Sequence, residues 1–160
     1  PVTPRTILQR IKRVWADAVA ENPSLRDVDM TTIGREIHNR IAEINRRLAP
    51  DGWQIHVEER LGSFEGIPQE TLDMTVRDYI GSHGELAWLE AELPRSVLGS
   101  KIRNLQPYMV LRGPGNQTIV WDLAPRLEPS HLAKTILYNH LLEPTGLTVI
   151  WESFWSNSAR

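Results

Sequence analysis

Two short segments decide the fold: residues 72–77, with the sequence LDMTVR, and residues 88–93, with the sequence WLEAEL. Each alternates apolar and polar side chains, as a strand does when only one of its faces is buried. On such strands Asp73 lies on the polar face of the first segment, and Glu90 and Glu92 lie on the polar face of the second. We therefore predict two neighbouring strands whose three carboxylates converge on one side of a sheet.

A cluster of three carboxylates repels itself unless a cation neutralises the charge. Hard oxygen ligands of this kind suit Mg²⁺ or Mn²⁺. The pattern predicts a metal-dependent phosphodiesterase, in which the ion polarises the scissile phosphate and lowers the pKa of a bound water. The alternative is that the three acids lie on a solvated sheet face and bind no metal.

The surrounding sequence predicts one α/β domain of residues 1–160, with a central mixed sheet flanked by helices. Helical spacing of apolar residues predicts four helices, over about residues 3–20, 32–48, 98–109 and 130–142. Alternating apolar and polar side chains predict strands over about residues 53–58, 71–79 and 86–93. Two further strands are predicted over about residues 118–123, after a turn at residues 113–116, and over residues 147–151. The predicted order of elements is ααβββαβαβ.

The composition excludes several classes of protein. With 18 basic and 20 acidic side chains the net charge is −2, which excludes a generally cationic nucleic-acid binder but allows a local basic patch. The absence of cysteine excludes disulfides, thiolate catalysis and cysteine-based zinc sites. No apolar run approaches about 18 residues, so we expect no membrane-spanning helix.

The element order, with acids on its second and third strands, resembles the PD-(D/E)xK (restriction-endonuclease-like) nuclease superfamily. The core of that superfamily runs α-β-β-β-α-β, and here it would span about residues 32–123. The N-terminal helix over residues 3–20 and an αβ unit over residues 129–152 would then be additions to the core. The resemblance implies a nuclease fold and a site on the second and third strands.

The signature of that superfamily is an Asp at the second strand and Glu-x-Lys on the third. This chain has PQETLD at residues 68–73 and then Glu90-Ala91-Glu92, so a glutamate stands where the lysine is usual. Some restriction enzymes similar to the superfamily also carry Glu there. Lys101, on the following predicted helix, could instead supply the ammonium group, or the domain has lost activity and only binds.

The resemblance also implies roles for individual side chains. The ligands of Mg²⁺ or Mn²⁺ would be Asp73, Glu90, Glu92 and, from the first core helix, Glu36. The catalytic groups would be Asp73, Glu90, Glu92 and Lys101, and the groups that contact substrate would be Arg95, Arg103 and Trp88. The histidines are scattered, and we interpret His131, near a predicted helix start, as a surface residue or one with a satisfied hydrogen bond.

The function implied is an endonuclease that cleaves DNA or RNA, with DNA as the expected substrate. Short members of the superfamily serve as toxin domains of secreted bacterial proteins in bacterial competition. We expect such an effector to act in the target-cell cytoplasm, to be blocked by a cognate immunity protein and to have no membrane partner. If the protein is not a delivered effector, we expect it to be cytoplasmic. The alternative is a non-catalytic interaction protein, either an immunity protein or a pseudo-nuclease. Close carboxylates with raised pKa favour the nuclease, whereas separated carboxylates paired with arginine favour the interaction protein.

Overall fold

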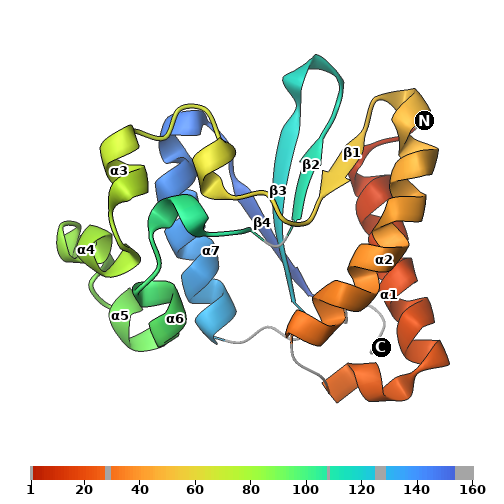
Figure 1. The fold of residues 1–160 in the computed structure, drawn as a ribbon, viewed down its shortest axis with the longest axis horizontal. Helices are drawn as coiled ribbons and strands as arrows, with labels where there is room; N and C mark the ends of the chain where they lie inside the picture. The colour runs from red at the N-terminus through yellow and green to blue at the C-terminus, as the bar shows by residue number, and fades with distance from the viewer. Residues whose placement is uncertain (1, 28–29, 108, 125–128, 154–160) are drawn as a thin grey trace.

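The computed structural model describes residues 2–27, 30–107, 109–124 and 129–153, whose arrangement is shown in Figure 1. The long helices are α1 (Pro4–Glu21), α2 (Met30–Leu48) and α7 (Pro129–Leu142). The short helices are α3 (Gln69–Asp73), α4 (Val76–Gly81), α5 (Leu89–Glu92) and α6 (Arg95–Leu98). The strands are β1 (Gln54–His56), β2 (Met109–Arg112), β3 (Thr118–Ala124) and β4 (Val149–Ser153). None of the described helices combines the length and the apolar character needed to cross a membrane.

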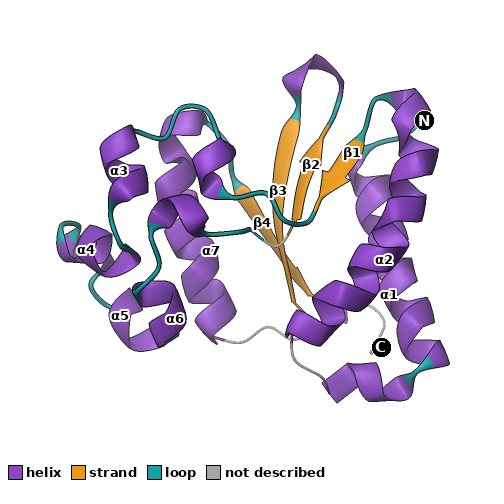
Figure 2. Ribbon diagram, viewed as in Figure 1, coloured by secondary structure: helices purple, strands orange, loops and turns teal. Residues whose placement is uncertain are grey.

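The four strands form one mixed sheet in the order β1-β2-β3-β4. The pairs β1–β2 and β2–β3 are antiparallel, and β3 and β4 are parallel. A parallel pair needs a crossover connection, and α7 provides it between β3 and β4. Helices cover both faces of the sheet, as Figure 2 shows, so the expected α/β class with a central mixed sheet flanked by helices is confirmed.

Alternation along the strands divides the interior into two apolar layers. Val110, Val120 and Val149 belong to the layer beneath α7, whereas Leu111 and Trp121 belong to the layer beneath α1 and α2. Successive side chains of a strand point to opposite faces, so two covered faces require strands that are apolar throughout. The run IVW at residues 119–121 has this property.

The N-terminal and C-terminal predictions are confirmed. Thr3 caps α1 through a capping box with Thr6, and Pro4 stands at the first helical position. Asn45 links helix α2 to the sheet through two hydrogen bonds with the backbone of Ile55. Its side-chain oxygen accepts from the N–H of Ile55 at 2.7 Å, and its side-chain nitrogen donates to the carbonyl oxygen of Ile55 at 2.9 Å. The expected strands over residues 53–58, 118–123 and 147–151 correspond to β1, β3 and β4.

The two segments that were expected to form the central strands are helical, so this prediction was wrong. Residues 71–79 contribute to α3 and α4, and residues 86–93 include a 3₁₀ turn and α5. The buried side chains of residues 71–79 are Leu72, Val76 and Tyr79, which are spaced by four and three residues. Burial at that spacing is the helical pattern, and it decides the structure over the alternation that suggested strands.

The middle of the chain also differs from the expected order. The predicted helix over residues 98–109 is replaced by the end of α6, a 3₁₀ turn over Ile102–Asn104 and the first residue of β2. The strand β2 was therefore missed. In the described residues the order of helices and strands is ααβααααββαβ, with residues 57–107 forming a helical insert between β1 and β2.

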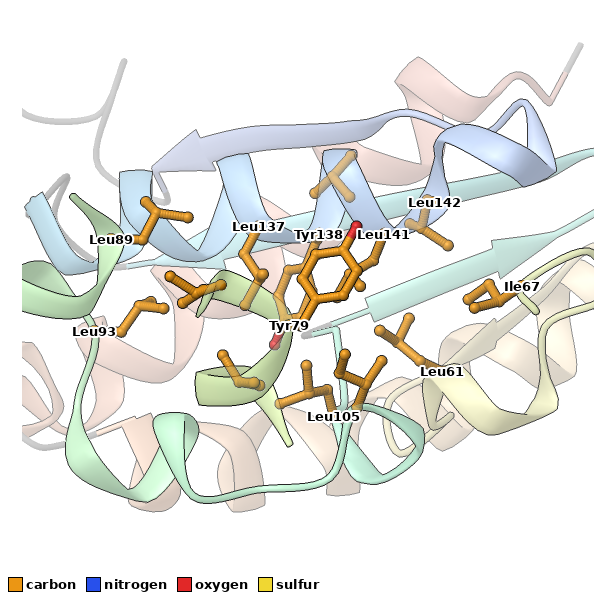
Figure 3. Close-up of a cluster of buried hydrophobic side chains, with 14 of the residues drawn as sticks. Leu61, Ile67, Tyr79, Leu89, Leu93, Leu105, Leu137, Tyr138, Leu141 and Leu142 are labelled. Carbon is orange, nitrogen blue, oxygen red and sulfur yellow. The ribbon is translucent and has the colours of Figure 1, made fainter. Parts of the chain in front are cut away.

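The helical insert packs against α7 and shares its apolar layer. Figure 3 shows Leu89 and Leu93 of the insert gathered with Tyr79 against Leu137 of α7, and these side chains belong to one buried cluster. The Tyr79 hydroxyl lies 2.6 Å from Nδ1 of His140 on α7. These contacts make the insert a part of the same folded unit as the sheet.

Candidate functional site

The structure places Asp73 beside an arginine and apart from the other expected metal ligands. Asp73 ends α3, and one of its carboxylate oxygens accepts a hydrogen bond from Nη2 of Arg103. This bond, with a smaller contribution from the charge of Lys101, holds the pKa of Asp73 below its ordinary value. Asp73 is therefore an exposed carboxylate that is paired with an arginine. Arg103, which was expected to contact substrate, instead neutralises the charge of Asp73.

Glu90 and Glu92 both lie on the exposed surface of α5. Glu90 forms a loose ion pair with Arg77, with Oε1 and Nε 3.8 Å apart. Among the described residues, no group of three or more acids and histidines is arranged to hold a metal ion. The expected convergence of three carboxylates is therefore absent, because the strands that would have aligned them are short helices.

The remaining expected residues lie at four separate places in the chain. Glu36 on α2 accepts hydrogen bonds from Nε and Nη2 of Arg40, at 3.1 and 3.0 Å. Lys101 is exposed and forms an isolated backbone bridge with Thr75. Arg95 is exposed at the start of α6, and Trp88, before α5, is 50% exposed.

A different carboxylate, Asp122 on β3, is buried. It is 6% exposed, and it is the one acid counted among the buried side chains of the described residues. Burial in the apolar layer raises its pKa, and this effect is opposed by a hydrogen bond from Thr135 and by the charges of His131 and Lys134. A buried acid with a raised pKa near cationic side chains is a candidate functional group.

Asp122 and Thr135 form a hydrogen-bonded network with two possible proton arrangements. The Thr135 hydroxyl oxygen lies 2.9 Å from Oδ2 of Asp122 and 3.0 Å from the carbonyl oxygen of His131. When Asp122 is ionised, the single hydroxyl proton is donated to the carboxylate. When Asp122 is protonated, its proton can be donated to Thr135, whose own proton then goes to the carbonyl. The network therefore tolerates both charge states of Asp122.

His131, one turn before Thr135 on α7, brings an unused polar atom to the same site. Its Nδ1 is buried and finds no hydrogen-bond partner among the described residues. A buried nitrogen without a partner is unfavourable by about 1–3 kcal/mol, so such an atom requires an explanation. Our interpretation of His131 as a surface residue or one with a satisfied hydrogen bond is therefore wrong at this nitrogen.

The position of this group in the fold suits a binding site. Asp122 lies towards the C-terminal end of β3, and His131, Lys134 and Thr135 lie on the N-terminal half of the crossover helix α7. In open α/β sheets, ligands bind outside the carboxyl ends of parallel strands. Tyr138, one turn further along α7, is buried, and both burial and the charge of Asp122 raise its pKa. We call Asp122, His131, Lys134, Thr135 and Tyr138 the Asp122 cluster.

A hollow of about 430 Å³ lies between α2 and β1. Its lining includes His38, His56 and Glu59. Glu59 accepts a hydrogen bond from Nε of Arg112 at 3.1 Å and a second bond from Nη2. Although burial favours the neutral acid, Arg112 and Ser63 hold the pKa of Glu59 below its ordinary value of 4.5. This strongly paired carboxylate is not available as a proton donor or a metal ligand.

The Glu59 pair predicts a specific dependence of stability on pH. A carboxyl whose pKa is lower in the folded state stabilises that state above the unfolded pKa, and the contribution disappears as pH falls through the folded pKa. The melting temperature of Glu59→Gln should therefore lie below that of the wild type at pH 7, and the difference should shrink as pH falls below about 4.5 and vanish below the lowered pKa of the folded state. The melting temperature of Glu58→Gln, at an exposed neighbouring site, should equal that of the wild type at every pH. A difference in melting temperature between Glu59→Gln and the wild type that does not change with pH would contradict the assignment.

The sequence carries a signal for Asp122 that alternation of apolar and polar residues does not reveal. The acid follows the run IVW directly, inside a strand that is apolar on both faces. An ionisable group in such a strand is buried and needs a partner. The threonine partner thirteen residues later lies on a helix whose packing could not be read from the sequence.

The comparisons with known proteins add no relative of this chain. No family model, curated protein or solved structure matches it.

Proposed function

We propose that this chain is a phosphodiesterase that cleaves nucleic acid and that Asp122 is the centre of its active site. The observation that carries the proposal is the burial of Asp122 at the C-terminal end of β3, with a raised pKa and with His131 and Lys134 close enough to influence it. Phosphodiester cleavage needs a base, an electrostatic partner for the phosphate and a positioned acid. The Asp122 cluster contains all three types of group.

The order of the core elements supports the same proposal. Without the helical insert, the chain runs α2-β1-β2-β3-α7-β4, which follows the α-β-β-β-α-β order of the PD-(D/E)xK superfamily. The proposed core therefore spans residues 30–153 instead of 32–123. Asp122 then takes the place of the acid on the third strand.

Two departures from that superfamily accompany this assignment. Strand β2 has the sequence MVLR and carries no acid. The cation lies on the helix, as Lys134, instead of two residues after the acid on the strand. Lys134 already influences the charge state of Asp122, which supports its role as the positive group of the site.

We place the divalent ion at Asp122 and no longer at Asp73, Glu90, Glu92 and Glu36, which the structure does not bring together as a metal-binding group. Mg²⁺ is commonly held by one or two carboxylates together with waters and substrate phosphates. Asp122 would hold the ion, and the unpartnered Nδ1 of His131 marks a polar position beside it. When bound, Mg²⁺ or Mn²⁺ supplies a Lewis acid for the phosphate and a more acidic water.

The other side chains of the cluster have separate roles in the proposed reaction. Thr135 orients the Asp122 carboxylate through its hydroxyl. His131 supplies an imidazole that can take part in proton transfer, and Nζ of Lys134 can offset negative charge that develops on the phosphate. Tyr138 helps to exclude water from the apolar side of the cluster, because its ring is buried there.

A cleavage assay tests the proposal. Plasmid DNA and total RNA are incubated with the protein and Mg²⁺ or Mn²⁺, beside reactions that contain EDTA. We expect cleavage that EDTA abolishes, and the substrate that disappears identifies the nucleic acid. No cleavage of either substrate, together with no change of melting temperature on adding metal, would overturn the proposal.

A non-catalytic interaction protein is the second candidate function. It is favoured by the separated carboxylates Asp73 and Glu90, which lie beside Arg103 and Arg77. In that case the chain would be an immunity protein or a pseudo-nuclease, and it would not cleave nucleic acid.

If the chain is instead a toxin domain, its expression in the cytoplasm of a bacterial host should arrest growth, and a cognate immunity protein should relieve the arrest.

A further inference from the structure

The charge of the chain is divided unevenly along its length. Residues 1–50, which include α1 and α2, contain nine basic and six acidic side chains, whereas residues 51–160 contain nine basic and fourteen acidic ones. Such an asymmetry between two parts of a chain is typical of proteins that bind a polyanion. The net charge of −2 therefore conceals a positive pair of helices on one face of the sheet.

The outer surfaces of α1 and α2 meet along a seam. The two helices pack side by side and run in opposite directions (Figure 1). Nη2 of Arg40 on α2 lies 2.6 Å from Oε2 of Glu21 at the end of α1, so both residues lie at this seam. Residues three and four apart share one side of a helix. Arg10 and Arg13 therefore lie on the same side of α1 as Glu21, and Arg47 lies on the same side of α2 as Arg40.

The charges are balanced at the end of the seam where α1 finishes. Nε and Nη2 of Arg40 donate to Glu36 at 3.1 and 3.0 Å, and Nη2 also donates to Glu21. Asp17, one turn before Glu21, adds a further acid to the same side of α1. This end of the seam therefore offers no free positive charge to a partner.

The opposite end of the seam joins the first half of α1 to the last turn of α2, and its basic side chains are Arg10, Arg13, Arg46 and Arg47, which we call the arginine end. Arg10, Arg13 and Arg46 are exposed and have no ion pair with any residue that the structure describes. The acids here are Glu43, which pairs with Arg47 at 3.1 Å, and Asp51, which follows α2. Lys12 already has an interaction and is not part of this surface. Three unpaired arginines thus outnumber the one remaining acid.

We propose that the arginine end binds the phosphate backbone of a nucleic acid, an inference that rests on the proposed function. A guanidinium group can donate two parallel hydrogen bonds to one phosphate. Phosphates recur at regular intervals along a nucleic acid, so arginines displayed on two packed helices can each contact one. Stabilisation of the helix dipole would account for Arg46 and Arg47 at the end of α2, but not for Arg10 and Arg13 in the first half of α1.

The arginine end lies away from the Asp122 cluster. Helix α2 leads into β1, where Gln54 is aligned through Arg112 of β2 with Thr118, the first residue of β3. Asp122 lies towards the other end of β3 and bonds to Thr135 of α7, on the opposite face of the sheet from α1 and α2. A polymer can contact both places at once, and a dinucleotide cannot. The substrate class is therefore polymeric nucleic acid, held at a distance from the reacting bond.

Binding is tested by fluorescence anisotropy with short fluorescein-labelled DNA and RNA duplexes in EDTA, so that metal-dependent cleavage does not interfere. Arg10→Gln/Arg13→Gln should weaken binding by roughly tenfold at low salt and reduce the slope of log Kd against log salt by about two, since each phosphate contact contributes about 0.9. Arg35→Gln/Arg77→Gln removes the same charge at two exposed arginines outside the arginine end. This control should keep the affinity within about twofold.

Cleavage kinetics distinguish this inference from the proposed function. With plasmid DNA, Arg10→Gln/Arg13→Gln should raise KM and leave kcat nearly unchanged, because only binding is lost. Its hydrolysis of bis(p-nitrophenyl) phosphate, which is too small to reach the arginine end, should equal that of the wild type. If the wild type binds the duplexes through the arginine end but cleaves no substrate, the proposed function fails and nucleic-acid binding at this surface stands.

Three results would overturn the inference. The first is equal duplex affinity of the wild type and Arg10→Gln/Arg13→Gln, with an unchanged salt slope. The second is tighter binding of polyglutamate than of either duplex, which would indicate an acidic protein as the partner. The third is tighter binding of vesicles that contain phosphatidylserine, which would indicate a membrane surface.

Discussion

Replacing Asp122 by Asn is expected to remove nucleic-acid cleavage and to leave the fold intact. Loss of a positioned acid or base lowers a rate by about 10²–10⁴-fold, and loss of a metal ligand acts at least as strongly. The amide keeps an oxygen that can accept the hydrogen bond from Thr135. The measurement is the initial rate of plasmid or RNA cleavage by the wild type and the variant at equal concentration.

The same variant should be at least as stable as the wild type at neutral pH. A carboxyl whose pKa is raised by folding binds more protons when folded, so its contribution to stability falls as pH rises from the unfolded pKa through the folded pKa. Asp122 has such a raised pKa because it is buried, and Asn has no charge to bury. The melting temperature of Asp122→Asn minus that of the wild type should therefore increase between pH 4 and pH 7.

Asp73→Asn is the matched control, because it makes the same substitution at an exposed acid. It should keep nearly wild-type cleavage and a melting temperature close to that of the wild type, since exposed ion pairs contribute little to stability. Full loss of cleavage in Asp73→Asn with normal cleavage in Asp122→Asn would return the site to α3. Normal cleavage in both would show that neither acid takes part in the reaction.

The second large effect is expected for Trp121→Ala. Trp121 is 2% exposed and belongs to the apolar layer between the sheet and the helices α1 and α2. Truncating a buried aromatic side chain to alanine lowers the free energy of unfolding by about 3–5 kcal/mol, because the contacts of the ring are lost and a cavity remains. Urea denaturation followed by far-ultraviolet circular dichroism measures this change without depending on tryptophan fluorescence.

Ile119→Ala is the comparison for this prediction, because Ile119 faces the same layer from the same strand and is only partly buried. Its cost should be about 1–2 kcal/mol. Equal costs for the two variants would mean that α1 and α2 are not held to β3 by Trp121. The comparison therefore tests the assignment of α1 and α2 to their own apolar layer.

The elements that were predicted correctly have strong local signals. Helix α1 has a capping box, a proline at its first position and a long apolar stripe, all within eighteen residues. Strand β3 is a continuous apolar run after a turn, and α7 begins at a proline. These signals depend on neighbours in the sequence, so they are readable without the tertiary structure.

The helical insert has no comparable signals, because its helices contain only four to six residues. In the segment 89–93, alternation predicts burial of Leu89, Ala91 and Leu93, but Ala91 is exposed. Short apolar runs fit both periods, and only packing chooses between them. Here the choice is made by α7, against which Leu89 and Leu93 are buried.

The sequence by itself therefore determined the class of the fold, its terminal helices and three of its four strands, because helix caps, periodicity and turns act over a few residues. The tertiary structure alone decided which polar groups meet. It separates Asp73 from Glu90 by giving each a place on a different short helix, and it joins Asp122 to Thr135 by packing α7 across the sheet. These contacts between polar groups depend on how whole helices and strands pack. Burial, not spacing in the sequence, determines the charge that each group carries.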